Sequence, residues 1–122
     1  MEQKSLDEQI RGQTMRWEWT EGPTAGQTHE HAFHSDGTMD WRVLDGAKAG
    51  TTGHEKRYAA VEVTEDVHVV SYLAESGFTV TAVLNFRDGS IVGFASSSKE
   101  WFPVRGTFEV PRAHARPGEK QR

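Results

Sequence analysis

The sequence consists largely of short runs in which apolar and polar residues alternate, separated by turn-forming residues at spacings of about 8–12 residues. In the first run, Trp17 and Trp19 share one face, whereas Arg16 and Glu18 share the other. A period of two residues is typical of a β-strand with one buried face. Eight such runs cover residues 14–20, 28–34, 38–43, 55–63, 67–74, 78–86, 91–98 and 104–110.

This pattern predicts an all-β fold, a small antiparallel eight-stranded barrel of the calycin or lipocalin type. Asp-Gly pairs at Asp36-Gly37 and Asp88-Gly89 indicate tight hairpin turns. A Gly-rich loop is expected at 45–53. Eight strands enclose either packed side chains or one small ligand. The residues that face inward therefore decide the function.

A chain of 122 residues fits one domain with one core. We expect an N-terminal segment at 1–11, the barrel at 12–110 and a tail at 111–122. The tail is rich in Arg, Pro and Gly and has no apolar period, so it is predicted to be disordered.

Composition excludes several classes of protein. The chain has 14 Lys and Arg against 18 Asp and Glu, a net charge of −4, so nucleic acid is not an expected partner. The absence of cysteine excludes disulfides, thiolate zinc sites and a cysteine nucleophile, and fits a reducing compartment. The first residues are charged and no apolar run reaches about 18 residues, so we expect a cytoplasmic protein that does not contact membranes.

One predicted inward stripe mixes apolar and polar side chains. Its apolar members are Trp17, Trp19, Phe33, Met39, Trp41, Val43, Val61, Val70, Phe78, Val80, Ala82, Leu84 and Phe94. The same parity brings in His29, His31, Arg57, His68, Tyr72 and Ser96. Burying such groups costs about 1–3 kcal/mol each unless they are hydrogen-bonded. The stripe is therefore the main candidate for a functional site.

The histidines allow three interpretations. His29 and His31 project from the same face of one strand and could move a proton, with Tyr72 assisting. Together with His68 they could instead chelate a divalent metal. They could also be surface histidines or satisfied core histidines. We favour an acid/base or hydrogen-bonding role and predict neither a metal nor a cofactor.

The remaining candidates would bind a ligand. Trp17, Trp19 and Trp41 could form flat walls, or could simply be core. An inward Arg57 would anchor a carboxylate, whereas a register slip of one residue would place Tyr58 inside and Arg57 in water. The predicted ligand-binding set is completed by His68, Phe94 and Ser96.

Known catalytic motifs are missing. The sequence has no nucleophile elbow, phosphate-binding loop or dinucleotide fingerprint. His54-Glu55 begins the H-E-x-x-H pattern, but the second histidine does not follow.

From Gly12 to Pro103 the chain resembles the MoaF-like domain family and, more distantly, the phenolic acid decarboxylases, which are small calycin-like barrels. The resemblance rests on the order and spacing of five segments. They are Gly12–Gly22, His29–Trp41, Val70–Tyr72, Val83–Phe86 and Val92–Pro103.

The decarboxylases grip the substrate carboxylate with two tyrosines, and the matching positions here resemble Trp17 and Trp19. Their catalytic arginine and glutamate fall near Thr51 and Ala74, where this chain has neither residue. The resemblance therefore implies a barrel with a ligand cavity, and it counts against decarboxylation of hydroxycinnamates.

Three functions remain open at this point. The first is a barrel that binds a flat aromatic or carboxylated small molecule. The second is a cofactor-independent lyase, isomerase or cyclase, with His31 or His29 as the acid/base and Arg57 as the anion anchor. The third is a non-catalytic partner protein. A homodimer is expected from the resemblance to the decarboxylases.

Overall fold

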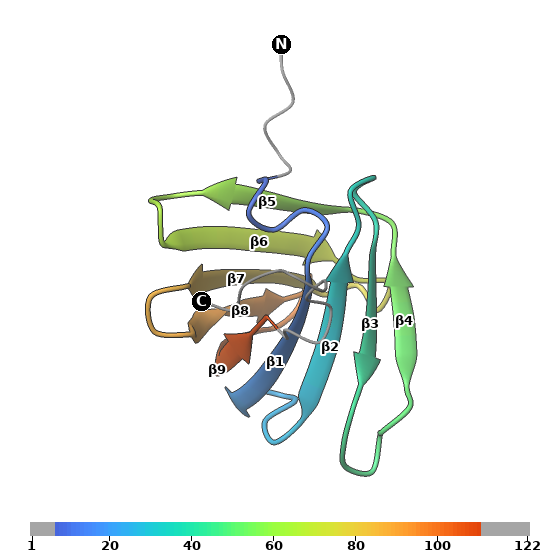
Figure 1. The fold of residues 1–122 in the computed structure, drawn as a ribbon. Helices are drawn as coiled ribbons and strands as arrows, with labels where there is room; N and C mark the ends of the chain where they lie inside the picture. The colour runs from blue at the N-terminus through green and yellow to red at the C-terminus, as the bar shows by residue number, and fades with distance from the viewer. Residues whose placement is uncertain (1–6, 111–122) are drawn as a thin grey trace, which may run out of the picture.

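The structure, a computed structural model, describes residues 7–110, which form one antiparallel sheet of nine strands and no helix (Figure 1). The strands are β1 (Thr14–Glu21), β2 (Thr28–Phe33), β3 (Met39–Val43), β4 (Thr52–Glu55), β5 (Tyr58–Glu62), β6 (Val67–Leu73), β7 (Thr79–Asn85), β8 (Ser90–Ser96) and β9 (Trp101–Glu109). The predicted all-β antiparallel barrel is confirmed, with nine strands instead of eight.

The sheet order explains how the barrel forms. The strands are arranged β4-β3-β2-β1-β9-β8-β7-β6-β5, so the first strand pairs with the last. The sheet folds over on itself, and β1–β4 run across β5–β8 in Figure 1. Its two edges, β4 and β5, are joined only by Lys56 and Arg57. The barrel is therefore nearly closed, with a seam between these two strands.

The extra strand corrects two predictions. Strand β4 lies partly in the expected Gly-rich loop, and the predicted strand 55–63 is in fact two strands with a corner between them. The corner shifts the alternation by one residue, so that Tyr58 is buried and Arg57 is exposed. The prediction that Arg57 and Val61 face inward is therefore wrong, and the alternative with Tyr58 inside holds.

Strand β8 corrects a third prediction. Ile91 is fully buried, whereas Phe94 is 52% exposed and packs edge-on against Trp101 outside the barrel. The inner face of β8 is crowded: a Cβ on Gly93 would lie 2.0 Å from the carbonyl oxygen of Thr81. Gly93 therefore takes the inward position, and its neighbour Phe94 faces outward.

Both predicted Asp-Gly turns are present. Asp36 accepts hydrogen bonds from the backbone N–H and the hydroxyl of Thr38 (2.9 and 2.7 Å), and Asp88 accepts the same pair from Ser90 (3.0 and 2.7 Å). Gly37 and Gly89 follow with positive φ, which glycine adopts without steric cost.

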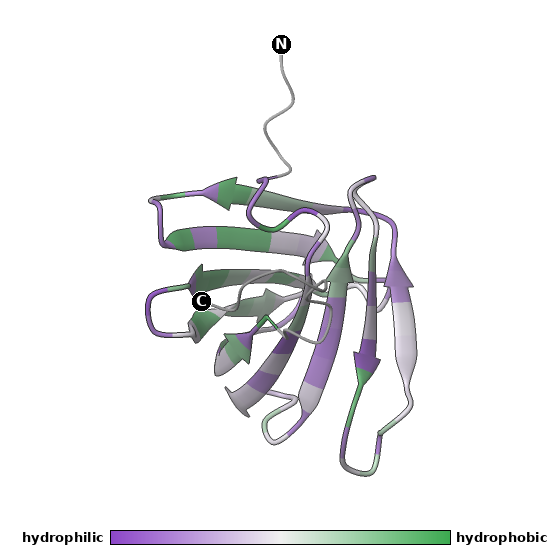
Figure 2. Cartoon of the chain, viewed as in Figure 1, coloured by the Kyte–Doolittle hydropathy of each residue, from purple (hydrophilic) through white to green (hydrophobic). Residues whose placement is uncertain are grey.

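The core lies between the two halves of the sheet. Its buried apolar side chains are Ile10, Met15, Trp17, Trp19, Phe33, Met39, Tyr58, Ala60, Val70, Ala82, Leu84, Ile91 and Val104. Figure 2 shows that β6 and β7 are apolar along much of their length, whereas β3 and β4 are more polar. A cavity that reaches β3 and β4 therefore has polar side chains on that side.

The segment before β1 bridges β5 and β2 and so closes the barrel beside the seam. Asp7 N–H donates to the carbonyl of Ala60 on β5 (3.0 Å), and Gly12 N–H donates to the carbonyl of Phe33 on β2 (2.7 Å). Ile10, between them, is fully buried. Although it was expected to lie outside the barrel domain, this part of segment 1–11 is integral to the core. The predicted disordered tail lies outside the described residues.

None of the residues 7–110 belongs to a helix long and apolar enough to cross a membrane.

Candidate functional site

A cavity of about 420 Å³ lies where β2, β3, β4 and β6 converge. It is lined by Thr24, His29, His31, Trp41, Thr52, Gly53, His54, Glu55, Tyr72, Ala74, Glu75, Ser76, Phe78 and Val80. Four of the predicted site residues, His29, His31, Trp41 and Tyr72, are therefore brought together in one cavity.

His31 is the most deeply placed polar group of this cavity. Its side chain is only 1% exposed, with the ring centroid 4.1 Å from that of Trp17 and 6.2 Å from that of Tyr72. Burial, with a smaller contribution from the neighbouring His29, lowers the pKa of His31 to about 3. The imidazole is therefore neutral at neutral pH. Its Nδ1 has no hydrogen-bond partner among the described residues.

His29 lies two residues earlier on β2 and is half-buried. Its Nε2 donates to Oε1 of Gln27 (2.8 Å), which leaves Nδ1 as an acceptor in the neutral ring. The ring stacks on Trp41 with centroids 6.2 Å apart and planes 21° apart. Burial lowers the pKa of His29, and the charge of Asp45 partly opposes this effect.

Glu55 supplies a buried carboxylate on β4. Its Oε2 accepts the indole N–H of Trp41 (2.9 Å), and its Oε1 accepts the backbone N–H of Glu75 (3.0 Å). Burial, together with the negative charge of Glu55, raises the pKa of Tyr72 well above its usual value. The phenol of Tyr72 is therefore protonated and can donate a hydrogen bond.

Gly53 makes room for Trp41. The two residues pair across β3 and β4, and a Cβ on Gly53 would lie 2.3 Å from the Trp41 ring. Only glycine leaves this space free. The indole of Trp41 can therefore lie against Glu55 and His29.

A second hollow, of about 590 Å³, borders the first at the seam between β4 and β5. The two share Glu55, Tyr72, Ala74 and Glu75, and Lys56 and Arg57 belong only to the second. No Lys or Arg of the described residues lines the 420 Å³ cavity. That cavity therefore offers the neutral imidazoles of His29 and His31, the third imidazole of His54, a phenol O–H and carboxylate oxygens between aromatic walls.

The other predicted site residues do not line the cavity. Trp17 and Trp19 are core residues behind it. Arg57 and Phe94 are exposed, and Ser96 is absent from the lining. His68 is buried elsewhere against Asp7, so His29, His31 and His68 do not converge as a metal-binding trio.

Glu55 was missed in the sequence because its strand was expected to continue through Arg57. The sequence pattern that could have revealed it covers only four residues. In Thr52–Glu55, burial alternates from residue to residue and places Gly53 and Glu55 on one face.

Comparison with known families agrees with this architecture. The family model described as MoaF-like matches residues 26–109. The chain belongs to the MoaF-like family. The matched region extends from the turn before β2 through β9, and so contains every residue of the cavity except Thr24.

A solved structure shares the fold. It is described as "Crystal Structure of a putative beta-lactamase from Burkholderia vietnamiensis", and it superposes with a TM-score of 0.69 over 84% of this chain and 95% of that chain. The two sequences are 22% identical, so the similarity shows a common fold. Among curated proteins, no sequence matches this chain.

Proposed function

We propose that this protein binds a flat, uncharged aromatic small molecule in the 420 Å³ cavity, with His31 as the polar contact that orients it. The observation that carries the proposal is the convergence of His29, His31, Trp41 and Tyr72 on one cavity. The Nδ1 of His31 has no hydrogen-bond partner among the described residues and almost no accessible surface, so the ring must turn to offer this atom to a ligand. Leaving a buried polar atom unpaired costs about 1–3 kcal/mol, which such a contact would recover.

The size and lining of the cavity support a small ligand. Ligand pockets are typically about 300–1,000 Å³, mostly apolar, with a few convergent polar groups. Trp41 and Tyr72 provide aromatic surfaces, and Phe78 and Val80 provide apolar ones. Glu55 holds the Trp41 indole in place.

The charges favour a neutral ligand over a carboxylated one. Glu55 and Glu75 contribute to the lining, and His29 and His31 have lowered pKa values. Arg57, the expected carboxylate anchor, is exposed and faces the other hollow. A carboxylate in the cavity would therefore meet negative charge without a compensating cation.

Calorimetry with 2-naphthol and 2-naphthoate tests this proposal. We expect 2-naphthol to bind, and 2-naphthoate to bind at least about tenfold more weakly. His31→Leu should weaken 2-naphthol binding by about tenfold. His34→Leu is the matched control, because His34 hydrogen-bonds Asp40 (3.0 Å) and does not line the cavity. Preferential binding of 2-naphthoate, or equal effects of the two substitutions, would overturn the proposal.

A second candidate function is cofactor-independent proton transfer, as in a lyase or isomerase. It is favoured by the presence of two neutral imidazoles and a protonated phenol in one cavity. A pKa of about 3 makes His31 a weak base, since a general base works best near the operating pH. His29 is therefore the better base, and Tyr72 would hold the substrate by donating a hydrogen bond.

Catalysis and binding are separated by His29→Ala. In an enzyme, this variant retains ligand affinity and loses turnover of aromatic substrates with an acidic C–H. In a binding protein, no histidine-dependent conversion occurs in either form.

A further inference from the structure

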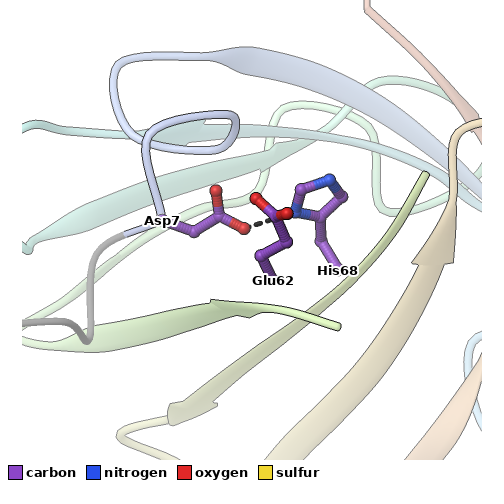
Figure 3. A group of neighbouring side chains, drawn as sticks. All are labelled: Asp7, Glu62 and His68. Carbon is purple, nitrogen blue, oxygen red and sulfur yellow. Dashed lines mark hydrogen bonds and ion pairs between the residues drawn. The ribbon is translucent and has the colours of Figure 1, made fainter. Parts of the chain in front are cut away.

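A second polar cluster lies at the opposite end of β6 from Tyr72. Asp7 of the N-terminal turn, Glu62 at the end of β5 and His68 at the start of β6 direct their side chains toward one another (Figure 3). The donor atoms of the three residues all lie within 4.8 Å of one another. The proposed ligand cavity does not use any of them.

Both ring nitrogens of His68 face oxygen atoms. Its Nε2 faces the backbone carbonyl of Glu65 at 3.2 Å, and its Nδ1 contacts the carboxylate of Asp7. A neutral imidazole has a single N–H. With that N–H donated to Glu65, Nδ1 is left as a lone-pair donor that points at carboxylate oxygens, which is the arrangement of a metal ligand set.

The cluster is held in place from outside. Asp7 has its other carboxylate oxygen bound by the backbone N–H of Gln9 (2.8 Å), and its own N–H bound to Ala60. Its side chain is 4% exposed and that of His68 is 1% exposed. Metal-binding histidines commonly donate their second N–H to a backbone carbonyl, which is the role of Glu65 here.

The donor set suits a divalent ion. Asp7 and Glu62 are two carboxylates, and among the described residues neither forms an ion pair with Lys or Arg. A divalent ion between them would match the charge of two carboxylates. Glu62 is exposed, so an ion can enter from solvent and retain water.

We infer that Asp7, Glu62 and His68 form a binding site for a divalent transition-metal ion of the zinc type. One imidazole nitrogen and two carboxylate oxygens are donors that zinc accepts. The ion would join the N-terminal turn to β5 and β6 and so fasten the segment that closes the barrel beside the seam.

Zinc titration of the chelator-treated full chain tests this inference, with calorimetry and thermal unfolding as readouts. Wild type should bind one equivalent and unfold at a higher temperature with zinc. Glu62→Gln should weaken zinc binding by at least about tenfold. Because Glu62 is exposed, this variant should fold normally without metal. Asp7→Asn retains an acceptor for Gln9 and should lose binding as well.

Two controls exclude other sites. His54→Ala disrupts the exposed group in which Asp40 accepts from His34 (3.0 Å) and His54 (2.5 Å), and His31→Leu alters the ligand cavity. Both should bind zinc as wild type does. The inference is overturned if wild type does not bind zinc, or if His54→Ala loses binding while Glu62→Gln retains it. In either case His68 and Asp7 form a buried hydrogen-bonded pair without a metal.

Discussion

His31 and His68 are equally buried, yet they lie in opposite chemical environments. Each side chain is about 1% exposed on the inner face of the barrel. His31 is surrounded by rings and has an unpartnered Nδ1. His68 has an oxygen acceptor at each ring nitrogen. Burial alone therefore does not define a role for an imidazole; its partners do.

The comparison suggests that the two ends of the barrel have different roles. At Asp7 and His68 the hydrogen bonds are made within the chain and stabilise it with or without a bound metal. The His31 cavity instead leaves a buried polar atom without a partner, at a cost in stability. Substitutions at the two ends should therefore change stability in opposite directions.

The largest expected effect follows removal of the partner of His68. Asp7→Ala leaves the buried imidazole without its carboxylate and should lower the free energy of unfolding by about 3–5 kcal/mol, measured by urea denaturation. Asp66→Ala is the control, since Asp66 pairs with Arg87 at the surface, and it should cost less than about 1 kcal/mol. Similar losses in the two variants would remove the contrast between the buried and exposed pairs.

Acidification should have the next largest effect on stability, through the buried imidazole of His31. The pKa of His31 is lowered to about 3 in the folded state and is about 6.5 in the unfolded chain. The unfolded state therefore binds more protons between these values, and stability falls as the pH drops below 6.5. Between pH 7 and pH 4.5, wild type should lose about 2–3 kcal/mol more than His31→Leu. Parallel pH profiles for the two proteins would contradict a lowered pKa.

Gly53→Ala should have a smaller effect. The added Cβ would collide with Trp41, so the indole must move away from Glu55, at a cost of about 1–3 kcal/mol and with a change in tryptophan fluorescence. In a Trp41→Ala background the same substitution should cost much less, which a double-mutant cycle measures. Additive losses would show that Gly53 acts independently of Trp41.

The smallest expected change has the opposite sign. His31→Leu at pH 7 replaces an unpaired buried imidazole by an apolar side chain and should leave the protein equally stable or more stable by about 1 kcal/mol. His68→Leu should be destabilising, because it leaves the Asp7 carboxylate buried without a partner. Equal losses for both variants, measured by thermal and urea unfolding, would mean that the two histidines are equivalent.

The alternating pattern predicted most of the fold because one side of each strand had to be buried. It failed where that rule was ambiguous. Val92 and Phe94 compete with Ile91 for the inner face of β8, and close contact with the neighbouring strand decides in favour of Ile91. The corner at Lys56–Arg57 changed the parity of β5 without a strong sequence signal.

The candidate site was predictable to a similar extent. His29, His31, Trp41 and Tyr72 share one cavity, as their common parity suggested. The position of His68 depends on Asp7, which is 61 residues away in sequence. Alternation within strands cannot predict which segment outside the strands packs against the barrel. The sequence therefore did not predict that His68 lies apart from the other histidines.

The most direct test is a nitrogen-15 NMR titration of the histidine side chains from pH 8 to pH 4, repeated with saturating 2-naphthol. His31 should stay neutral across this range, and its ring nitrogens should shift on addition of 2-naphthol, while those of His68 should not. Protonation of His31 near pH 6.5, or a response to 2-naphthol at His68 in place of His31, would contradict this prediction.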